Sequence, residues 1–113
     1  MLTVKKTRKY GRGVFTSEFI KKGTAIEVSP LIIVSSKRDV NKVMDTALSS
    51  YVYDFKGKLA IALGLGSLFN HSESANVEWK VLFKDEKILY WAKEDIPAGS
   101  QLFINYGYDP LEQ

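Results

Sequence analysis

The sequence predicts a small, mainly β protein built from many short strands. Short apolar or alternating runs recur along the chain, turn residues separate them, and no segment keeps the 3.6-residue periodicity of a long helix. A chain of 113 residues, 45% hydrophobic and 26% charged, is long enough to bury one core. We therefore expect a single domain over residues 1–113.

The N-terminal part is expected to begin with an edge strand over residues 2–6, whose lysines discourage pairing with other chains. Gly11 and Gly13 flank Arg12, and this spacing permits a tight turn or a close approach of backbone to a ligand. Residues 31–34 are predicted as a further strand and residues 35–42 as a polar loop. One or two helical turns are expected within residues 43–50.

Two distant segments share the pattern Ile-x-x-Gly-(Thr/Ser)-x-(Ile/Leu)-x-(Val/Ile). They are residues 20–28 and residues 96–104. In both, a glycine turn leads into the alternation of a half-buried strand. We expect the two units to pair with each other.

Two hairpins are predicted in the second half of the chain. The first covers residues 51–62 and turns at Lys56-Gly57, a sequence suited to positive backbone φ angles. The second joins residues 77–83 to residues 88–92 through a turn at 84–87. These hairpins complete the expected set of short strands.

Composition excludes several classes of site. The chain has no cysteine and one histidine, His71, so it cannot form a disulfide framework or a closed zinc site. No serine or cysteine lies at a recognisable nucleophile spacing from His71. No apolar run approaches the length of a membrane span, and no secretory leader is evident. We expect no metal, no membrane partner, and a cytoplasmic or nuclear location.

Charge is uneven along the chain, although the net value is only +3. Residues 1–22 sum to +6, whereas residues 85–113 sum to −4. An acidic C-terminal third is suited to a lysine-rich peptide. The basic N-terminal arm has little interleaved aromatic character apart from Tyr10, so direct nucleic-acid binding is not favoured.

Four motifs follow one another in a fixed order. They are Gly11-Arg12-Gly13-Val14-Phe15, Phe69-Asn70-His71-Ser72 followed by Asn76, Ile96-Pro97-Ala98-Gly99, and Asn105-Tyr106-Gly107. In this order and at these separations they resemble the motifs of the SET-domain protein-lysine methyltransferases. With no flanking cysteine clusters, the chain looks most similar to the minimal SET proteins of large DNA viruses and some bacteria. The resemblance implies a β-clip fold of several small sheets with a C-terminal pseudoknot.

The resemblance also implies roles for particular residues. It makes Tyr106 and Tyr51 the catalytic residues. It assigns the contacts with S-adenosylmethionine to Arg12, Gly13, Asn70, His71 and Tyr106. It implies a substrate channel lined by Tyr51, Trp79, Ile104 and Tyr108. Tyr53 and Tyr90 are interpreted as packing residues.

The function implied is methyl transfer from S-adenosylmethionine to a lysine side chain of a protein, with histone tails among the compatible substrates. A lysine of reference pKa about 10.4 must lose a proton before it attacks, and an aromatic, poorly hydrated channel favours the neutral amine. The alternative is a non-catalytic β-clip module that binds a protein or peptide. Tyr106 together with Asn70-His71 favours the enzyme, because a binding module does not need them.

Further expectations follow from two positions that differ from the family's motifs and from the residues after Tyr106. Ala75 stands where the family often has proline, and Gln101 stands where it usually has glutamate. Seven residues follow Tyr106, too few for a zinc-clamped flap, so a homodimer partner is expected to wall the channel. Ile104 and Trp79 occupy the positions where the family can carry a tyrosine that limits methylation. Repeated methylation is therefore expected.

Overall fold

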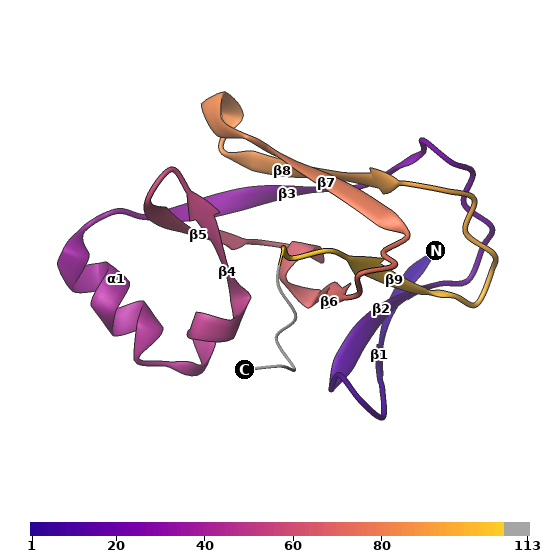
Figure 1. The fold of residues 1–113 in the computed structure, drawn as a ribbon, viewed down its shortest axis with the longest axis horizontal. Coiled ribbons are helices and arrows are strands. Elements are labelled where there is room, and N and C mark those ends of the chain that lie inside the picture. Colours follow the sequence, from indigo (N-terminus) through magenta and orange to yellow (C-terminus); the bar gives the residue numbers. More distant parts are fainter. Residues whose placement is uncertain (108–113) are drawn as a thin grey trace.

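The computed structural model describes residues 1–107, which form strands, one short α-helix and three 3-10 turns (Figure 1). The elements are β1 (Leu2–Lys6), β2 (Arg12–Thr16), β3 (Ala25–Val34), α1 (Lys37–Met44), η1 (Ala47–Tyr51), β4 (Val52–Phe55), β5 (Lys58–Ala62), η2 (Gly66–Leu68), β6 (Asn70–His71), β7 (Val77–Leu82), η3 (Phe83–Asp85), β8 (Lys87–Ala92) and β9 (Gln101–Ile104). The prediction of a mainly β fold of small sheets is confirmed.

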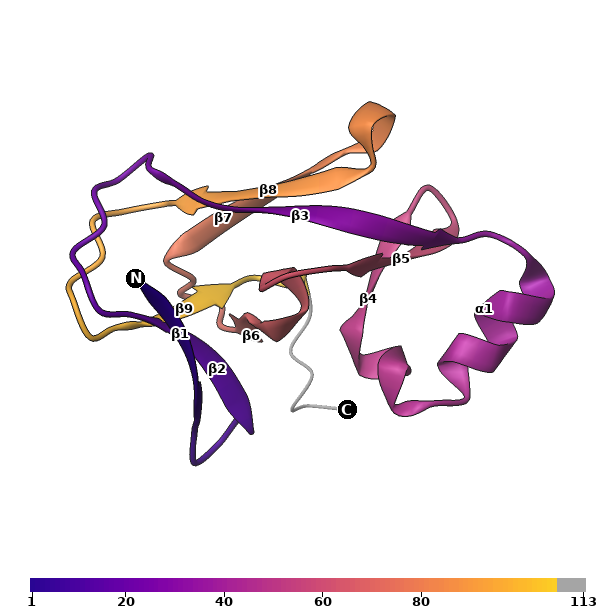
Figure 2. The ribbon, with the colours of Figure 1, turned by 180° about the vertical axis from the view of Figure 1, so that it is seen from behind.

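The larger sheet has the strand order β4-β5-β3-β8-β7. Both predicted hairpins lie in it, and Lys56 and Gly57 have φ angles of 52° and 86° at the turn of the first. The strand predicted at residues 31–34 joins the one before it to make β3, which spans ten residues and pairs with β5 and β8. This long strand links the two hairpins into one sheet (Figures 1 and 2).

The smaller sheet has the order β1-β2-β9-β6. Strands β1 and β2 form an antiparallel hairpin that extends away from the larger sheet (Figure 2). Strands β6 and β9 pair in parallel, with Asn70 opposite Phe103 and His71 opposite Ile104. This pairing brings the Asn-His motif beside the C-terminal segment, although about thirty residues separate them in the sequence.

The repeated Ile-x-x-Gly units meet as expected. Ile20 and Ile96 form an antiparallel bridge in which each backbone N–H donates to the other's carbonyl, at 2.9 and 2.8 Å. Gly23 and Gly99 both have a φ angle of 86°, a region that glycine adopts without steric cost. The two glycine turns therefore have the same backbone form and lie at one end of the molecule, next to this bridge.

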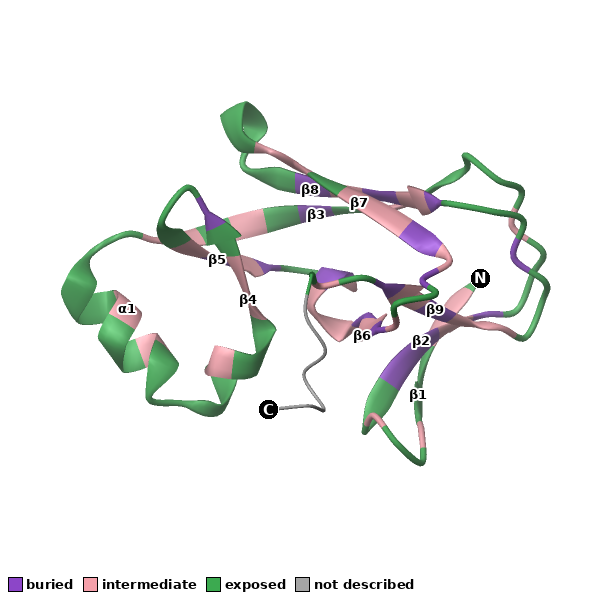
Figure 3. Ribbon diagram, viewed as in Figure 1, coloured by how far each residue is buried: buried purple, intermediate pink, exposed green. Residues whose placement is uncertain are grey.

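The core lies between the two sheets (Figure 3). Its fully buried side chains come from both sheets and include Val14, Phe69, Ile88, Tyr90, Ile96, Leu102 and Ile104. Trp79 and Tyr106 pack against this cluster from the outside. The core thus fixes the base of β6 and β9, the two strands that carry the predicted site.

The predicted loop at residues 35–42 is wrong, because α1 covers most of it. Ser36 caps the helix by accepting a hydrogen bond from the Asp39 N–H at 3.1 Å, which satisfies a backbone donor that the first turn leaves free. The helix has no buried residue, and its apolar stripe consists of only three side chains, Val40, Val43 and Met44 (Figure 3). Within residues 1–107, no helix is long and apolar enough to cross a membrane.

Candidate active site

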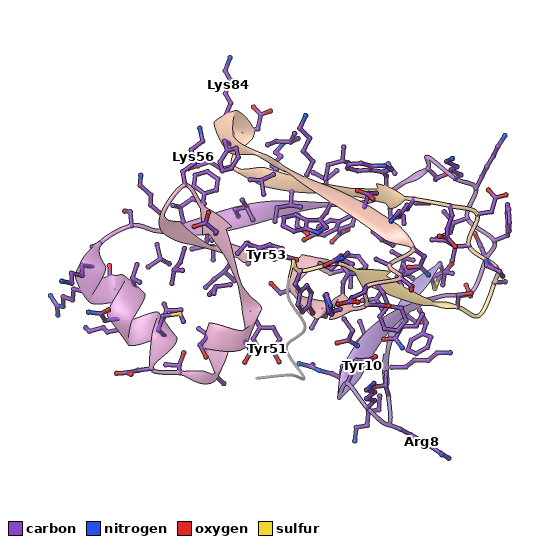
Figure 4. The ribbon with its side chains drawn as sticks, viewed as in Figure 1. Arg8, Tyr10, Tyr51, Tyr53, Lys56 and Lys84 are labelled. Atoms are coloured by element: carbon purple, nitrogen blue, oxygen red, sulfur yellow. The ribbon has the colours of Figure 1, made fainter. Side chains whose placement is uncertain are left out.

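Two pockets border the segment between β5 and β6, because residues of this segment line both of them. We call the first the hairpin pocket, because the β1–β2 hairpin forms one side of it; its volume is about 580 Å³. Its lining residues are Lys6, Thr7, Tyr10, Gly11, Arg12, Ser50, Tyr51, Ser67, Leu68, Asn70 and Tyr106. Figure 4 shows Tyr10 on the hairpin and Tyr51 across from it. The pocket offers two cations and three phenol rings.

We call the second the sheet pocket, because β4 and β7 of the larger sheet contribute to it; its volume is about 330 Å³. It is lined by Ser50, Tyr51, Val52, Tyr53, Asp54, Gly66, Ser67, Phe69, Trp79, Val81 and Tyr106. Most of these side chains are aromatic or aliphatic, and Asp54 is the one carboxylate among them. Such a pocket accepts an apolar chain and disfavours a buried charge.

The two pockets share four residues, Ser50, Tyr51, Ser67 and Tyr106, which we call the shared wall. Ligands held on the two sides of this wall would meet at these side chains. Tyr51 and Tyr106, the two residues that the sequence predicts to be catalytic, both belong to it. No other predicted site residue lines both pockets.

Tyr106 is held at both its backbone and its side chain. Its backbone N–H donates to His71 Nδ1 at 2.9 Å, and its hydroxyl donates to the Phe69 carbonyl at 2.5 Å. The His71 and Tyr106 rings also pack together, with their centroids 5.1 Å apart. These contacts fix the direction of the Tyr106 ring. His71 on β6 contacts its backbone and ring, and Phe69, the residue before β6, accepts from its hydroxyl.

His71 therefore acts as an anchor in this structure. Its Nδ1 accepts the Tyr106 N–H, so in the neutral ring the proton lies on Nε2. Nε2 is buried and has no hydrogen-bond partner among the described residues. The ring is 6% exposed and does not line either pocket. This placement agrees with the view of His71 as a framing residue and gives it no carboxylate partner for base catalysis.

Asn70 joins the hairpin to the C-terminal strand. Its Nδ2 donates to the Arg12 carbonyl at 2.8 Å and to Gln101 Oε1 at 2.9 Å. Gly13 lies directly beside this contact, since a Cβ built on it would be 2.9 Å from Asn70 Nδ2. A side chain at position 13 would displace Gln101 Oε1, the nearest atom, as well as Asn70 Nδ2. Gly13 thus acts by leaving room for Asn70, and it does not itself line the hairpin pocket.

The C-terminal segment is clamped from the other side by Asn76. Its side chain donates to the Gln101 carbonyl at 2.9 Å and accepts from the Phe103 N–H at 2.8 Å, which replaces a missing strand partner. Further on, Trp79 Nε1 donates to the Asn105 carbonyl at 2.9 Å. Strand β7 therefore holds β9 and the residues after it against the sheet pocket.

A second hydrogen-bonded group lies at the edge of the sheet pocket. The Tyr53 hydroxyl donates to the Gly66 carbonyl at 2.8 Å and lies 2.9 Å from the Tyr90 hydroxyl. A Cβ built on Gly66 would be 2.6 Å from the Tyr90 oxygen, so only glycine lets these rings approach. Behind them, Glu27 accepts the Leu65 N–H at 2.7 Å and fixes the Gly64–Leu68 segment.

Burial keeps both of these phenols protonated. It raises the pKa of Tyr53 to about 12, an effect that the hydrogen bond with Tyr90 partly opposes. Burial also raises the pKa of Tyr90 above its ordinary value, and the nearby Tyr53, Glu27 and Tyr106 add to the increase. Both hydroxyls are neutral hydrogen-bonding groups at physiological pH.

The remaining predicted residues have different positions. Arg12 lines the hairpin pocket and Trp79 lines the sheet pocket. Ile104 is fully buried in the core, against which Tyr106 packs, and it does not line the sheet pocket. Tyr108 lies outside the described residues. Among the described residues, no group of three or more acidic or histidine side chains is placed to hold a metal.

Sequence reasoning missed several lining residues. Ser50, Ser67 and Lys6 carry no distinctive local pattern, and they reach the pockets only through the fold. Tyr53 was interpreted as a packing residue; its ring does pack on Trp79, with centroids 5.2 Å apart, but it also lines the sheet pocket. The available signal was the i, i+2 spacing of Tyr51 and Tyr53 within the predicted hairpin, because residues at this spacing on a strand share a face; in the structure Tyr51 ends η1 and β4 begins at Val52.

Comparison with known proteins agrees with this geometry. The SET domain family model matches residues 11–107. A histone-lysine N-methyltransferase of Schizosaccharomyces pombe, specific for lysine 37 of histone H3, is 38% identical over 107 residues, covering 94% of this chain and 73% of that protein. The histone-lysine N-methyltransferase Set8 of Drosophila pseudoobscura pseudoobscura is 31% identical over 86% of this chain, which spans 16% of that protein.

Solved structures show the same fold. A Plasmodium falciparum protein described as a candidate histone methyltransferase superposes with a TM-score of 0.74 at 26% identity, over 96% of this chain and 99% of that one. A histone lysine methyltransferase studied for product specificity gives a TM-score of 0.78 at 20% identity, over 94% of this chain and 50% of that one. At that identity the second match concerns the fold alone.

The chain belongs to the SET-domain family. Within that family it is a protein-lysine methyltransferase, because relatives that match across most of its length are named for that activity.

Proposed function

We propose that the protein transfers a methyl group from S-adenosylmethionine, held in the hairpin pocket, to a lysine side chain of a histone, held in the sheet pocket. The observation that supports this proposal most strongly is the shared wall. Two pockets of different character meet at Ser50, Tyr51, Ser67 and Tyr106, so a donor on one side and an acceptor on the other are adjacent there.

The hairpin pocket fits the cofactor in charge, shape and size. Lys6 and Arg12 are suited to its carboxylate, and the faces of Tyr10, Tyr51 and Tyr106 are suited to its sulfonium cation. The volume of about 580 Å³ lies within the range of roughly 300–1,000 Å³ that small-molecule sites occupy. When bound, the cofactor supplies an electrophilic methyl group.

The sheet pocket supplies the conditions that a lysine nucleophile needs. Asp54, exposed and with one oxygen used by the Gly57 N–H at 3.2 Å, attracts the incoming ammonium. Farther in, Phe69, Trp79 and Val81 offer little hydration, so the neutral amine is favoured over the cation. The proton leaves to solvent before the amine attacks.

Tyr106 then orients the reaction. Its ring is fixed through His71 and Phe69, so its hydroxyl oxygen has a defined position in the shared wall. Alignment of this kind contributes roughly 7 to 11 kcal/mol in favourable cases. The threading of the C-terminal segment as a pseudoknot belongs to this proposal: the parallel β6–β9 pairing and the Asn76 clamp support it.

The substrate proposed is histone H3, since the relative from Schizosaccharomyces pombe is named for lysine 37 of that histone. A nuclear or other intracellular location goes with this substrate. The test is incubation of the purified chain with labelled S-adenosylmethionine and recombinant histone H3, followed by mass spectrometry. We expect methyl incorporation at lysine 37, and its loss when that lysine is replaced by arginine. Calorimetric binding of both ligands without any transfer would instead support the non-catalytic alternative.

A homodimer is the second part of the proposal. Met44 and Leu48 are 48% and 46% exposed in the same segment as Tyr51, so apolar surface lies close to the shared wall. Covering it with a partner would also exclude water from the two pockets. Light scattering over a concentration series, paired with activity, tests this. A monomer that stays fully active at nanomolar concentration contradicts a catalytic role for the dimer.

A further inference from the structure

The β1–β2 hairpin carries five cationic side chains and no acidic one. No aspartate or glutamate occurs in residues 2–16, whereas the cations are Lys5, Lys6, Arg8, Lys9 and Arg12. Lys6 and Arg12 are partners in the β1–β2 register and both line the hairpin pocket, where the proposed reaction uses them to hold the cofactor. Lys5, Arg8 and Lys9, which we call the outer cations, have no role in that reaction.

The outer cations lie outside the hairpin pocket, which none of them lines. Lys5 is one residue along β1 from the strand pair that lines this pocket, so its side chain projects from the opposite face of the hairpin. Arg8 projects outward from the tip (Figure 4). All three side chains are exposed, and none forms an ion pair with a carboxylate of residues 1–107. Grouped, unpaired charges of one sign attract a partner of the opposite sign.

The tip of the hairpin has a fixed shape. The Thr7 N–H donates to the Gly11 carbonyl at 2.5 Å, and the Tyr10 N–H donates to Thr7 Oγ1 at 2.8 Å. The Tyr10 ring also packs edge-on against Phe103 of β9, with ring centroids 5.6 Å apart. The backbone that carries two of the outer cations is therefore ordered before a ligand arrives, which lowers the entropic cost of binding.

Two of the outer cations cover aromatic rings. Lys5 Nζ lies 5.4 Å from the centre of the Phe15 ring, and Lys9 Nζ lies 5.5 Å from the centre of the Tyr10 ring. A nucleic-acid base would have to displace these ammonium groups before it stacked on the covered ring faces. The hairpin is therefore suited to phosphate groups, whose contacts position a nucleic acid but carry no sequence information.

We propose that the outer cations bind the phosphate backbone of the DNA that packages the histone substrate. This inference rests on the proposed function, because it takes a histone as the substrate. A lysine-rich histone tail is repelled by a cationic hairpin. The DNA wrapped around histones carries one negative charge per about 1.7 Å of helix axis and is attracted by it. The hairpin thus adds affinity for packaged histone that free histone lacks.

This proposal changes an expectation drawn from the sequence. Direct nucleic-acid binding was not favoured there, because the basic N-terminal arm has little aromatic character apart from Tyr10. That argument concerns single strands, whose bases stack on exposed rings. A duplex is held through its phosphates, which require cations alone. We therefore expect duplex binding without sequence preference.

The test measures the affinity of the full chain for a labelled DNA duplex of random sequence by fluorescence anisotropy. Three phosphate contacts contribute a slope of about −2.7 to log affinity against log salt, a fall of roughly 40-fold between about 50 and about 200 mM salt. The outer-cation variant, which combines Lys5→Gln, Arg8→Gln and Lys9→Gln, should lose that contribution. Arg8→Gln alone should lose about 0.9 of it. A wild-type chain that does not bind the duplex at the lowest salt overturns the proposal.

A matched variant separates the position of the outer cations from net charge. Lys58→Gln, Lys84→Gln and Lys87→Gln remove three exposed cations from the two hairpin turns of the larger sheet. Figure 4 shows Lys84 at the opposite end of the molecule from Arg8. Because salt screens charges that lie far from the contact, this control should stay within about twofold of the wild-type affinity. Equal losses in the two triple variants would overturn the assignment to the hairpin.

Methyl transfer tests the consequence for the substrate. With histone H3 packaged in nucleosomes, the outer-cation variant should lower kcat/KM roughly 10- to 100-fold near physiological salt. With free histone H3 it should keep the wild-type value, because no outer cation lines either pocket. Equal losses on both substrates would contradict a DNA contact. If no methyl transfer occurs on either substrate, the proposed function fails, while the duplex measurement still decides whether the outer cations bind DNA.

An acidic protein surface is the other anionic partner that a hairpin of this charge attracts. A labelled polyglutamate peptide, measured by the same method and at the same salt, represents that chemistry. The wild-type chain should bind the duplex more tightly than polyglutamate, and the outer-cation variant should lose that difference. Equal or tighter binding of polyglutamate by the wild type would assign the outer cations to an acidic protein and overturn the proposal.

Discussion

Two regions supply three of the four residues of the shared wall, and they differ in how they are held. The crossing, which we define as residues 69–76 and 101–106, has Phe69, His71 and Ile104 in or against the core. The arm, residues 37–51, has no buried residue in either α1 or η1. The crossing contributes Tyr106 to the wall, and the arm contributes Ser50 and Tyr51.

The difference follows from the number and kind of contacts. In the crossing, side chains replace missing backbone partners, as Asn76 does for Phe103 and His71 does for Tyr106. In the arm, the side-chain hydrogen bonds are local caps from Ser36 and Thr46, apart from a long one from the Ser67 hydroxyl to the Tyr51 carbonyl at 3.4 Å. We therefore expect the arm to open at a lower free energy than the crossing. The crossing therefore keeps Tyr106 aligned, while opening of the arm lets the substrate enter.

The largest effect on turnover is expected in the crossing, at Tyr106. Tyr106→Phe should lower turnover about 100-fold or more, a size typical for the loss of one positioned hydroxyl in an active site. The free energy of unfolding should fall by only about 1 kcal/mol, since one hydrogen bond to Phe69 is lost. Turnover on histone H3 and urea denaturation measure the two quantities. Unaltered turnover would remove Tyr106 from the mechanism.

His71→Ala should affect folding most. It removes a buried ring and leaves the Tyr106 N–H without its acceptor, so the free energy of unfolding should fall by about 2 to 3 kcal/mol. Cofactor affinity should weaken at the same time, because the strand that carries Asn70 loosens. Asn70→Ala should act in the same direction. A stable His71→Ala protein with full cofactor affinity would contradict the description of the crossing.

Alkaline pH should lower the free energy of unfolding through the phenol of Tyr53, which lines the sheet pocket. The pKa of Tyr53 is raised from 10.0 to about 12 by folding, so the unfolded chain loses this proton first. Its contribution is fully present below pH 10 and is lost as pH rises to 12, which lowers the free energy of unfolding by about 2 to 3 kcal/mol. Urea denaturation across this window should show a smaller decline for Tyr53→Phe. An identical decline in both proteins would argue against burial of this phenol.

The smallest effect is expected on the arm. Met44→Ser and Leu48→Ser should change the free energy of unfolding by less than about 0.5 kcal/mol, because both side chains are largely exposed. Hydrogen exchange should show the amides of α1 opening before those of β9. Losses above 2 kcal/mol in these variants would mean that the arm is packed as firmly as the crossing.

The sequence predicted the regions where local chemistry decides the structure. Lys56-Gly57 set the hairpin turn through positive φ angles, and the matching Ile-x-x-Gly units were found to meet at Ile20 and Ile96. It missed α1, because the helix is eight residues long and buries nothing, so its apolar stripe of Val40, Val43 and Met44 is too short to stand out in the sequence. Pattern reasoning detects burial more readily than it detects capping.

The site was predictable where motifs mark it and less so elsewhere. Tyr51, Tyr106, Arg12 and Asn70 were named from motifs, and all four line the hairpin pocket. Gln101 was named only as a departure from the family's glutamate. Its side chain accepts a hydrogen bond from Asn70, a contact that exists because β9 and β6 are adjacent in the folded chain. Ser67, which lines both pockets, was not named at all. Such residues reach the site through long-range pairing, which no local pattern records.

The most direct test of the two-pocket account uses one variant on each side of the shared wall. Arg12→Gln keeps the backbone carbonyl that Asn70 uses and removes a cation from the hairpin pocket. Asp54→Asn keeps an oxygen that can accept from the Gly57 N–H and removes the carboxylate from the sheet pocket. Calorimetry should show Arg12→Gln weakening S-adenosylmethionine alone and Asp54→Asn weakening the histone H3 peptide alone. If both variants weaken the same ligand, or if each weakens the ligand assigned to the other pocket, the account of two pockets meeting at Tyr106 is wrong.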